Sequence, residues 1–311
     1  MTPERLPYLS ADSLRRSLTW PQAVDALERS LRSHQSPGHT PPRAVIDVTS
    51  GQLLLMPAEV GADVGVKVAT VRGNRARGDL PRIQGVYLLF DGRTMQPLAL
   101  VDGVALTLLR TAAVSALAVR YLAEPGPARL VVFGSGPQAW AHVQSIAAVR
   151  ALAEVVVVAR TMHTANELVE QCRQAGLRAG RGESGAVREA DLVACCTTAR
   201  EPLFDSHLLR DHATVVAVGS HEPTAREVDT DLVRRATVVV ETRGSALREA
   251  GDILLAMADG VDEPTAVAGE ISDLVNGRVR LEPAHPRLFK SVGEAWGDLV
   301  LAATAVRAGI R

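Results

Sequence analysis

The sequence predicts an α/β protein that combines a doubly wound parallel sheet with a smaller α+β region, and three observations favour this class. Val-rich apolar runs alternate with helical stretches over residues 129–241, which is typical of a parallel sheet covered on both faces. The first of these runs ends in the glycine-rich segment FGSGPQA, at residues 133–139. Residues 43–101 hold shorter strand-like runs, with the hairpin signal Asp91-Gly92 between the last two.

The N-terminal region is expected to run from a helix through strands to a second helix. Residues 10–34 look helical, because Thr19 can cap a helix and Val24 and Leu27 recur at helical spacing. Strands are expected in RAVIDV, GQLLLMPA, VGVKVATV and GVYLLFDGRTMQPLALV, which together indicate a mostly antiparallel sheet. A helix is then expected from Asp102 to about Leu122.

The segment EPGPA separates this region from the alternating one. Strands are expected there in RLVVFGSG, EVVVVAR, LRAG, DLVACCTT, ATVVAVGS and ATVVVE, with helical stretches in between. The C-terminal segment LFKSVGEAWGDLVLAATAVRAG, residues 288–309, is interpreted as one amphipathic helix with a glycine after it.

Composition excludes several classes of protein. The formal net charge of -1 does not argue for a surface that binds nucleic acid or a membrane. No apolar run approaches the roughly 20 residues of a membrane span, and MTPERLPYLSADSLRRS lacks the apolar core of a signal peptide. The 3 cysteines and 8 histidines show no disulfide framework and no metal-ligand spacing. We therefore expect a cytoplasmic protein without a metal.

The glycine-rich segment fits a phosphate-binding turn. In Gly134-Ser135-Gly136-Pro-Gln138-Ala139, the first glycine permits a tight turn and the second lets the backbone approach a pyrophosphate. The small Ala139 lets the following helix pack on the strand. Because the turn follows a Val-rich strand and opens a βαβ unit, it predicts a Rossmann-type dinucleotide site. A tight turn without a ligand is the weaker alternative.

The next strand indicates which dinucleotide is bound. NAD-binding versions of the motif carry an acid at the end of the second strand, but here that strand ends in Ala-Arg160-Thr161. A guanidinium matches the oxygens of a 2′-phosphate, so Arg160 favours NADP(H) and leaves NAD(H) possible; a plain surface arginine is the alternative. The ends of later strands supply candidates for the nicotinamide side, each of which can also be a helix cap or turn residue: Thr197, Thr198, Gly219, Ser220, His221 and Glu241.

Cations in the N-terminal region suggest a site for an anion. Of 34 basic residues only Lys67 and Lys290 are lysines, and an ammonium can lose its proton whereas a guanidinium cannot. Lys67 shares its strand face with the small Gly65, which leaves room for a ligand. Arg110 lies in an apolar helical stripe and needs a partner, either a ligand or an internal acid. With Arg43 at the start of the first strand, three cations are available for a carboxylate.

Several segments together resemble the ornithine cyclodeaminase/μ-crystallin family. They are LTLLRTAAVSALA, FGSGPQA, AVGSHEPTAREVD, EAGDI and FKSVGEAWGDLVLAA, in the expected order over roughly residues 40–305. The resemblance implies a Rossmann domain, residues 117–285, inserted into a smaller α+β substrate and dimerisation domain. That second domain would comprise residues 1–116 and a C-terminal helix, 286–311. A homodimer is implied, and the apolar strands near the N-terminus also favour one, because strand edges need covering.

The resemblance also implies roles for individual residues. Arg43, Lys67 and Arg110 match carboxylate-binding residues, Lys67 also matches a proton relay, and Met56 matches a pocket residue. Gly134, Gly136, Gln138 and Ala139 match the family's pyrophosphate turn, and Arg160-Thr161 resembles its NADPH-binding version. Cyclodeaminases of the family have an aspartate for the side-chain amine where this chain has His221, a candidate catalytic residue and a poor partner for an ammonium.

These features give one leading expectation and two alternatives. The family's shared step passes a hydride between a nicotinamide and the α-carbon of an amino or imino acid. We therefore expect an NAD(P)H-dependent oxidoreductase that reduces a cyclic imino acid such as Δ1-pyrroline-2-carboxylate, or acts on a small amino acid. The alternatives are an ornithine cyclodeaminase that recycles its NAD, and a protein that binds NADPH and a small carboxylate without turnover.

Overall fold

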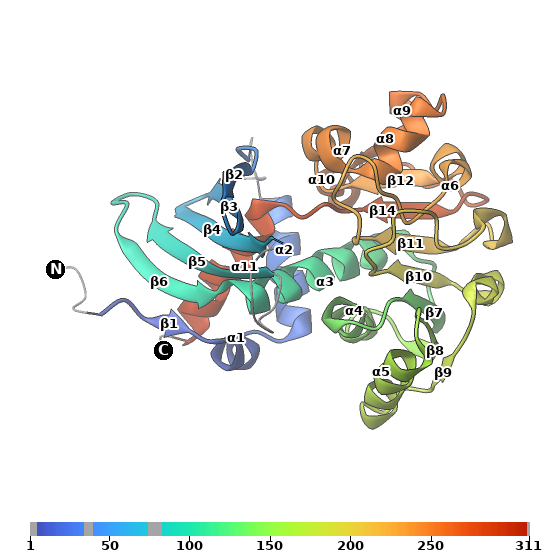
Figure 1. The fold of residues 1–311 in the computed structure, drawn as a ribbon, viewed down its shortest axis with the longest axis horizontal. Coiled ribbons are helices and arrows are strands. Elements are labelled where there is room, and N and C mark those ends of the chain that lie inside the picture. The colour runs from blue at the N-terminus through green and yellow to red at the C-terminus, as the bar shows by residue number, and fades with distance from the viewer. Residues whose placement is uncertain (1–4, 34–39, 74–82, 310–311) are drawn as a thin grey trace. The chain divides into compact units, whose positions relative to one another are not determined.

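The computed structural model describes residues 5–33, 40–73 and 83–309. Contacts divide the chain into two compact units (Figure 1). Unit 1 comprises residues 1–110 and 294–311, and unit 2 comprises residues 111–293. Helix α3 (Gly103–Leu122) begins in unit 1 and continues into unit 2.

Unit 1 contains the predicted antiparallel sheet. Its strand order is β1-β6-β5-β4-β3-β2. The strands are β1 (Tyr8–Leu9), β2 (Ala44–Val48), β3 (Gly51–Val60), β4 (Asp63–Arg72), β5 (Ile83–Asp91) and β6 (Pro97–Asp102). Strands β2 to β6 form a continuous antiparallel meander, while the short β1 pairs parallel with β6 and was not predicted.

The N-terminal helical segment is two helices rather than one. Helix α1 (Ala11–Ser17) ends at Leu18, and α2 (Trp20–Arg32) begins after Thr19. The Gln22 side chain accepts a hydrogen bond from the Thr19 backbone N–H at 2.9 Å. Thr19 therefore starts a second helix within the predicted span instead of capping a single one.

One face of the unit 1 sheet is covered by helix α11 (Ala295–Gly309), which contacts β3, β4, β5 and α2. On β4, Lys67 and its small neighbours lie on this buried face, whereas Val64, Val66 and Val68 on the other face are only half-buried. The predicted alternation of β4 is therefore confirmed, with Lys67 on the inner side.

Unit 2 contains the predicted parallel sheet. All its pairs are parallel, in the order β13-β12-β14-β11-β10-β7-β8-β9. The strands are β7 (Ala128–Phe133), β8 (Leu152–Val158), β9 (Ala179–Arg181), β10 (Leu192–Cys195), β11 (Thr214–Ala217), β12 (Thr237–Val240), β13 (Gly269–Glu270) and β14 (Arg287–Lys290). The helices are α4 (Pro137–Ala147), α5 (Met162–Gln174), α6 (Thr230–Arg235), α7 (Arg243–Glu249), α8 (Gly251–Ala258), α9 (Glu263–Ala266) and α10 (Ile271–Val275), with 3₁₀ turns η1 (Ser184–Glu189) and η2 (Ser206–Leu208).

The prediction of one helix over residues 288–309 was wrong. Strand β14 lies in the middle of the parallel sheet, between β11 and β12, and the helix begins only at Ala295. Leu288 and Phe289 are fully buried, and a short apolar run buried on both faces cannot be told from a helical segment by periodicity. Helix α11 is also buried along most of its length rather than amphipathic.

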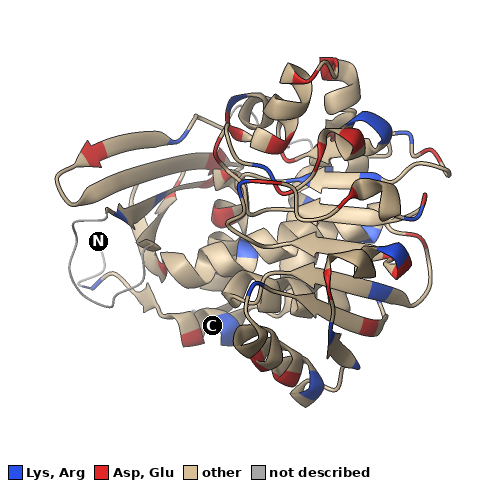
Figure 2. Cartoon of the chain, turned by 45° about the vertical axis from the view of Figure 1, so that its right-hand side comes forward, with Lys and Arg blue, Asp and Glu red and all other residues tan. Residues whose placement is uncertain are grey.

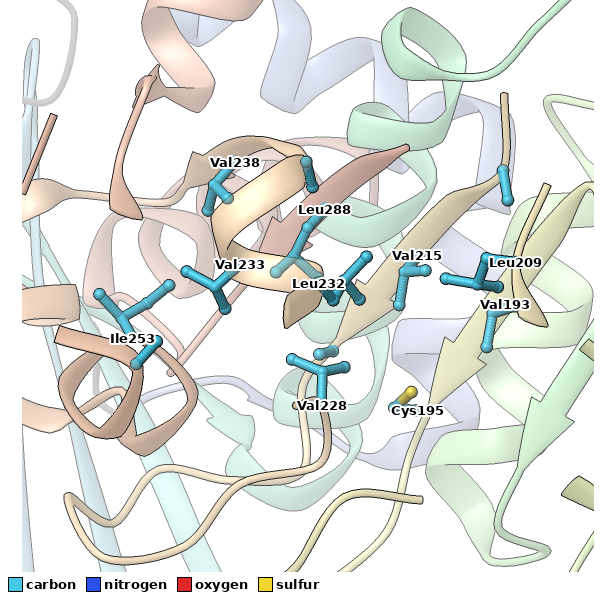
Figure 3. Close-up of a cluster of buried hydrophobic side chains, with 14 of the residues drawn as sticks. Val193, Cys195, Leu209, Val215, Val228, Leu232, Val233, Val238, Ile253 and Leu288 are labelled. Carbon is cyan, nitrogen blue, oxygen red and sulfur yellow. The ribbon is translucent and has the colours of Figure 1, made fainter. Parts of the chain in front are cut away.

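One hydrophobic cluster of unit 2 lies on one side of the sheet (Figure 3), and the alternate strand residues are buried on the other side. Val193, Val215 and Leu288 project from β10, β11 and β14. Leu232 of α6 and Ile253 of α8 pack against them. This packing fixes the strand ends from which the candidate dinucleotide residues extend.

Helix α3 is the exception to the expectation that no segment reaches membrane length. Its 20 residues, with a hydropathy of 1.4, are long and apolar enough by composition, and it is the single such helix among the described residues. Because 67% of that window is buried inside the fold, α3 has the character of a core helix.

Candidate active site

Two of the predicted cations meet at a buried carboxylate in unit 1. The Lys67 ammonium donates to Asp298 Oδ2 at 2.7 Å and to Thr107 Oγ1 at 3.1 Å. The Lys67 and Asp298 side chains are only 3% and 0% exposed. Arg110 approaches the other carboxylate oxygen, with 3.4 Å between its Nε and Asp298 Oδ1. The internal acid considered as an alternative partner for Arg110 is therefore present.

Asp298 was not among the predicted site residues, although it lies within the segment FKSVGEAWGDLVLAA. Asp298 is in the first turn of α11, among residues that are almost all apolar and buried. A charge in such a helix requires a partner of opposite sign, and this signal was available in the sequence. The identity of the partner was not, because Lys67 is 231 residues away along the chain.

Both cations keep donors for a ligand. A lysine ammonium has three N–H donors, and Lys67 directs one each to Asp298 and Thr107. Thr107 donates its own hydroxyl proton to the Gly103 carbonyl at 2.7 Å, so it accepts from Lys67. Within the described residues, Arg110 forms no hydrogen bond, and its ion pair with Asp298 is made through Nε at 3.4 Å. One N–H of Lys67 and the outer edge of the Arg110 guanidinium are thus available to an anion.

Burial is the main cause of the lowered pKa of Lys67. Burial lowers the pKa of Lys67 to about 8; the carboxylate of Asp298 opposes this shift, and the positive charges of Arg110 and Arg43 add to it. Arg43, half-buried just before β2, is therefore close enough for its charge to act on Lys67. The three predicted cations lie in one neighbourhood of unit 1.

The neighbouring strands frame Lys67 with uncharged side chains. Met56 on β3 and Tyr87 on β5 are its register partners, and both are buried. The Tyr87 hydroxyl has no hydrogen-bond partner among the described residues. Burial raises the pKa of Tyr87 far above its usual range, and the carboxylates of Asp298 and Asp63 add to the shift. Tyr87 is therefore protonated at any physiological pH.

The glycine turn in unit 2 has the geometry of a phosphate cradle. Gly134 has a φ of +105°, and a Cβ at this position would lie 2.5 Å from the Cys196 carbonyl oxygen. A Cβ on Gly136, the N-cap of α4, would meet no atom within 4 Å. Only glycine suits the first position, and the second borders open space beside the N-terminus of an 11-residue helix. The fully buried Ala139 lets α4 pack on the sheet.

The other residues of the turn differ in their contacts. Ser135 is half-buried, and Gln138 has a buried side-chain oxygen without a partner among the described residues.

The Gln138 carbonyl is bonded to Nδ1 of His142 at 2.8 Å, and Nε2 of His142 lies 3.0 Å from the Ser115 hydroxyl. Burial lowers the pKa of His142 to about 4, so the ring is neutral, with Nδ1–H donating and Nε2 accepting.

Arg160 follows the carboxyl end of β8 and is exposed, with no partner in the described part of the chain. Thr161 is the N-cap of α5, and its hydroxyl lies 2.8 Å from that of Thr164. Arg160 is therefore free to bind an anion beside the turn.

Two candidates for the nicotinamide side are bonded within the protein instead. Glu227 accepts from the Thr197 backbone N–H at 2.8 Å, the Thr197 hydroxyl at 2.7 Å and the Gly219 N–H at 2.7 Å. A Cβ on Gly219 would overlap the Thr197 carbonyl, so this glycine permits close approach of two strand ends. By contrast, Thr198 and His221 are exposed.

The remaining candidates at the strand ends are buried. Glu241 accepts from the Ser291 hydroxyl and, at 2.9 Å, from the Gly293 N–H. The Ser220 hydroxyl donates to the Ala225 carbonyl. These contacts stabilise the loops that follow β11 and β14.

The second lysine has a structural environment. Lys290 at the end of β14 lies 2.8 Å from Asp252 and donates to the Ser220 carbonyl at 2.7 Å. Asp252 in turn accepts from the backbone N–H groups of Glu227 at 2.6 Å and Val228 at 3.0 Å. Lys290 therefore connects the end of β14 with the loop after β11 and with α8. Of the two lysines, only Lys67 lies in the candidate site.

Elsewhere in the described parts of the chain, charged residues of both signs are mixed. In Figure 2 basic and acidic residues are interspersed along the elements of both units. Across the described ranges, no group of three or more His, Cys, Asp or Glu side chains has the arrangement of a metal site.

Comparisons with known proteins show the family of the chain. The family model described as Ornithine cyclodeaminase/mu-crystallin family matches residues 9–310. The chain is 30% identical to a Delta(1)-pyrroline-2-carboxylate reductase of Colwellia psychrerythraea, over 97% of this chain and 98% of that protein. It is 32% identical to the ketimine reductase mu-crystallin of Rattus norvegicus, over 95% of each. The solved structure of Thermococcus litoralis Delta(1)-pyrroline-2-carboxylate reductase in complex with NADH and L-proline has a TM-score of 0.90 and 28% identity, over 98% of each chain.

Proposed function

This chain belongs to the ornithine cyclodeaminase/mu-crystallin family, and from that premise we propose that it is an NAD(P)H-dependent imine reductase. Its substrate is a small cyclic imino acid, with Δ1-pyrroline-2-carboxylate as the first candidate. The relatives named as Delta(1)-pyrroline-2-carboxylate and ketimine reductases match nearly the whole chain, which supports the class of reaction.

The observation that carries the proposal is the buried cation pair of unit 1. Lys67 and Arg110 share one carboxylate, so two positive charges face a single internal negative charge. The unused donors of both residues suit a ligand that brings a second carboxylate. Arg43 adds a third cation whose charge reaches the same place.

In the proposed reaction, different residues bind the nucleotide, bind the substrate and transfer the proton. A reduced nicotinamide nucleotide supplies the hydride when bound, and Gly134, Gly136 and Gln138 are the residues that would hold its pyrophosphate. Arg110 and Arg43 bind the substrate carboxylate and orient the imine. Lys67 donates a proton to the imine nitrogen, which its pKa of about 8 permits near neutral pH. The product is the cyclic amino acid, and Lys67 regains a proton from solvent.

We assign NADPH rather than NADH as the preferred nucleotide. No acid follows β8, and Arg160 offers an exposed, unpaired guanidinium at that position. Such a group pairs with a 2′-phosphate. The Thermococcus litoralis relative is described with NADH, so the preference rests on Arg160 of this chain.

The contacts among the residues that the structure describes do not favour the cyclodeaminase alternative. That reaction needs an anion for the side-chain ammonium of the diamino acid. The residue at the corresponding position, His221, is exposed, and the next acid, Glu222, forms an ion pair with Arg200 at 2.8 Å.

A spectrophotometric screen tests the proposal. NADPH and NADH oxidation should be followed with Δ1-pyrroline-2-carboxylate, Δ1-piperideine-2-carboxylate and pyruvate plus ammonia, beside ammonia release from L-ornithine with catalytic NAD. We expect NADPH oxidation with a cyclic imine and little ammonia from ornithine. Steady ammonia and proline production would establish the cyclodeaminase instead. NADPH binding without turnover of any imine would point to a binding protein.

A further inference from the structure

We propose that Asp298 is a positioning residue, which together with Thr107 orients Lys67 so that its one remaining N–H is presented to the substrate. The proposal rests on the function proposed above, in which Lys67 donates the proton. Asp298 itself touches neither the substrate nor the nucleotide in this scheme.

The geometry around Lys67 leaves one direction open. The bonds to Asp298 Oδ2 and Thr107 Oγ1 come from two different helices, α11 and α3. Two fixed N–H bonds on a tetrahedral nitrogen determine where the third one points. Asp298 and Thr107 take up two of the three N–H groups, so the third one is available for proton transfer.

Asp298 also acts on the protonation of Lys67 through its negative charge. The ionisable groups that act on Lys67 are Asp298 from α11, Arg110 from α3 and Arg43 before β2, while Tyr87 on β5 stays neutral. Burial and both arginines disfavour the ammonium, and Asp298 is the one ionisable group on the described elements that favours it. Without the carboxylate, Lys67 would lose its proton at a lower pH and could not act as an acid.

The proton-transfer step balances with Asp298 as a spectator. The N–H bond of Lys67 breaks as an N–H bond to the substrate nitrogen forms, and the electron pair stays on Lys67 Nζ. Asp298 remains ionised before and after, so it stabilises the charged donor without exchanging a proton. Solvent then reprotonates Lys67.

The second buried pair of the chain provides a contrast. Lys290 and Asp252 are 2.8 Å apart, and both also bond to backbone groups, which is expected of a structural pair. Asp298, by comparison, has no bond to a backbone group among the described residues, and its contacts are with the side chains of Lys67 and Arg110. The Lys67–Asp298 pair therefore lacks the backbone bonds of a structural pair, and Asp252→Asn is a matched control for Asp298→Asn.

Because the chain has only two lysines, carbon-13 labelling of lysine Cε gives two side-chain signals that can be titrated directly by NMR. Lys67→Arg and Lys290→Arg assign them. We expect the Lys67 midpoint of about 8 to fall by about 1–3 pH units in Asp298→Asn and to stay unchanged in Asp252→Asn. An unchanged Lys67 midpoint in Asp298→Asn overturns the proposal. This measurement uses the protein without substrate, so it does not depend on the proposed reaction.

Kinetics provides the second readout. The basic limb of kcat for imine reduction should move down in Asp298→Asn by the same interval as the NMR midpoint. Asp298→Glu keeps the charge but displaces it, so it should retain the midpoint and lose kcat. An unmoved kcat limb overturns the positioning role, as does failure of both variants to fold, which would make Asp298 a structural residue. Absence of imine reduction by the unaltered protein would count against the proposed function, and the NMR result would still stand.

Discussion

At the scale of the residue, a substitution of Arg110 can distinguish a role in substrate binding from a role in stabilising the fold. Its guanidinium is almost fully buried, and its ion pair with Asp298, through Nε at 3.4 Å, forms no hydrogen bond. A lysine at this position would keep the charge near Asp298 but lose the planar edge that binds a carboxylate.

We therefore expect Arg110→Lys to raise KM for the imino acid and to lower kcat/KM by about tenfold or more, since a charged hydrogen bond contributes ~1.5–3 kcal/mol. NADPH binding should be retained, as measured by fluorescence titration. Arg287→Lys is the matched control, because Arg287 is also buried but pairs with Glu124 at 2.6 Å. Unfolding of Arg110→Lys alone would show that Arg110 is mainly a structural partner of Asp298.

The second prediction for a single residue concerns Arg160 and the preference for NADPH over NADH. Its exposed guanidinium should attract a 2′-phosphate, and Arg160→Asp should repel that group and accept ribose hydroxyls. The ratio of kcat/KM for NADPH to that for NADH should reverse in the variant. The exposed Arg188, on η1, provides a control for a general loss of positive charge through Arg188→Asp. Equal use of both nucleotides before and after the Arg160 change would contradict the assignment.

The acidity of Lys67 predicts a pH dependence with a definite sign. Burial lowers its pKa to about 8, so the ammonium predominates below that pH and the amine above it. Imine reduction needs the ammonium, so kcat should fall as pH rises through about 8, whereas oxidation of the amino acid needs the amine and should rise. A pH profile of kcat in both directions checks this, and parallel behaviour of the two directions would argue against Lys67 as the proton donor.

At the scale of the element, the turn between β7 and α4 shows two glycines retained for different reasons. Gly134 has a left-handed φ and a carbonyl close to its missing Cβ, whereas Gly136 has an extended backbone beside open space. Glycine at position 134 is required by the backbone conformation, whereas glycine at position 136 keeps open the space through which a pyrophosphate would approach.

Alanine variants should separate these reasons. Gly134→Ala should lower the free energy of unfolding by roughly 1–2 kcal/mol, because it forces a left-handed backbone. Gly136→Ala should unfold at the same temperature as the unaltered protein but bind NADPH more weakly, because the new methyl group occupies the approach to the pyrophosphate. Thermal unfolding with and without NADPH measures both effects. Full stabilisation of Gly136→Ala by NADPH would contradict the cradle.

At the scale of the whole molecule, the outer face of the unit 1 sheet suggests self-association. Opposite the face covered by α11, Val64, Val66 and Val68 are half-buried, and their register partners include Leu88 and Phe90. An apolar sheet face of this kind needs a cover, and a second copy of the chain supplies one with matching chemistry.

We propose a homodimer through this face and expect light scattering to give twice the mass of the chain at micromolar concentration. Val66→Glu should yield monomers, because it places a charge in the centre of the face. Val104→Glu is a control at another exposed apolar residue. A monomeric unaltered protein would refute the dimer.

The sequence by itself determined what depends on local pattern. Apolar alternation identified strands β2 to β6, Val-rich runs identified the main strands of the parallel sheet, and the glycine spacing identified the turn at residues 134–139. These signals lie within a few neighbouring residues, where backbone preference and burial act together.

Only the tertiary structure decided what depends on pairing across the chain. A buried run does not reveal its neighbours, so β14 was mistaken for helix until its position between β11 and β12 was known. Thr197 and Gly219 resembled ligand-binding residues, but a single buried acid, Glu227, occupies their hydrogen bonds. The pairing of Lys67 with Asp298 closes a separation of 231 residues. Burial makes each such charge require a partner, and the fold alone selects which partner is within reach.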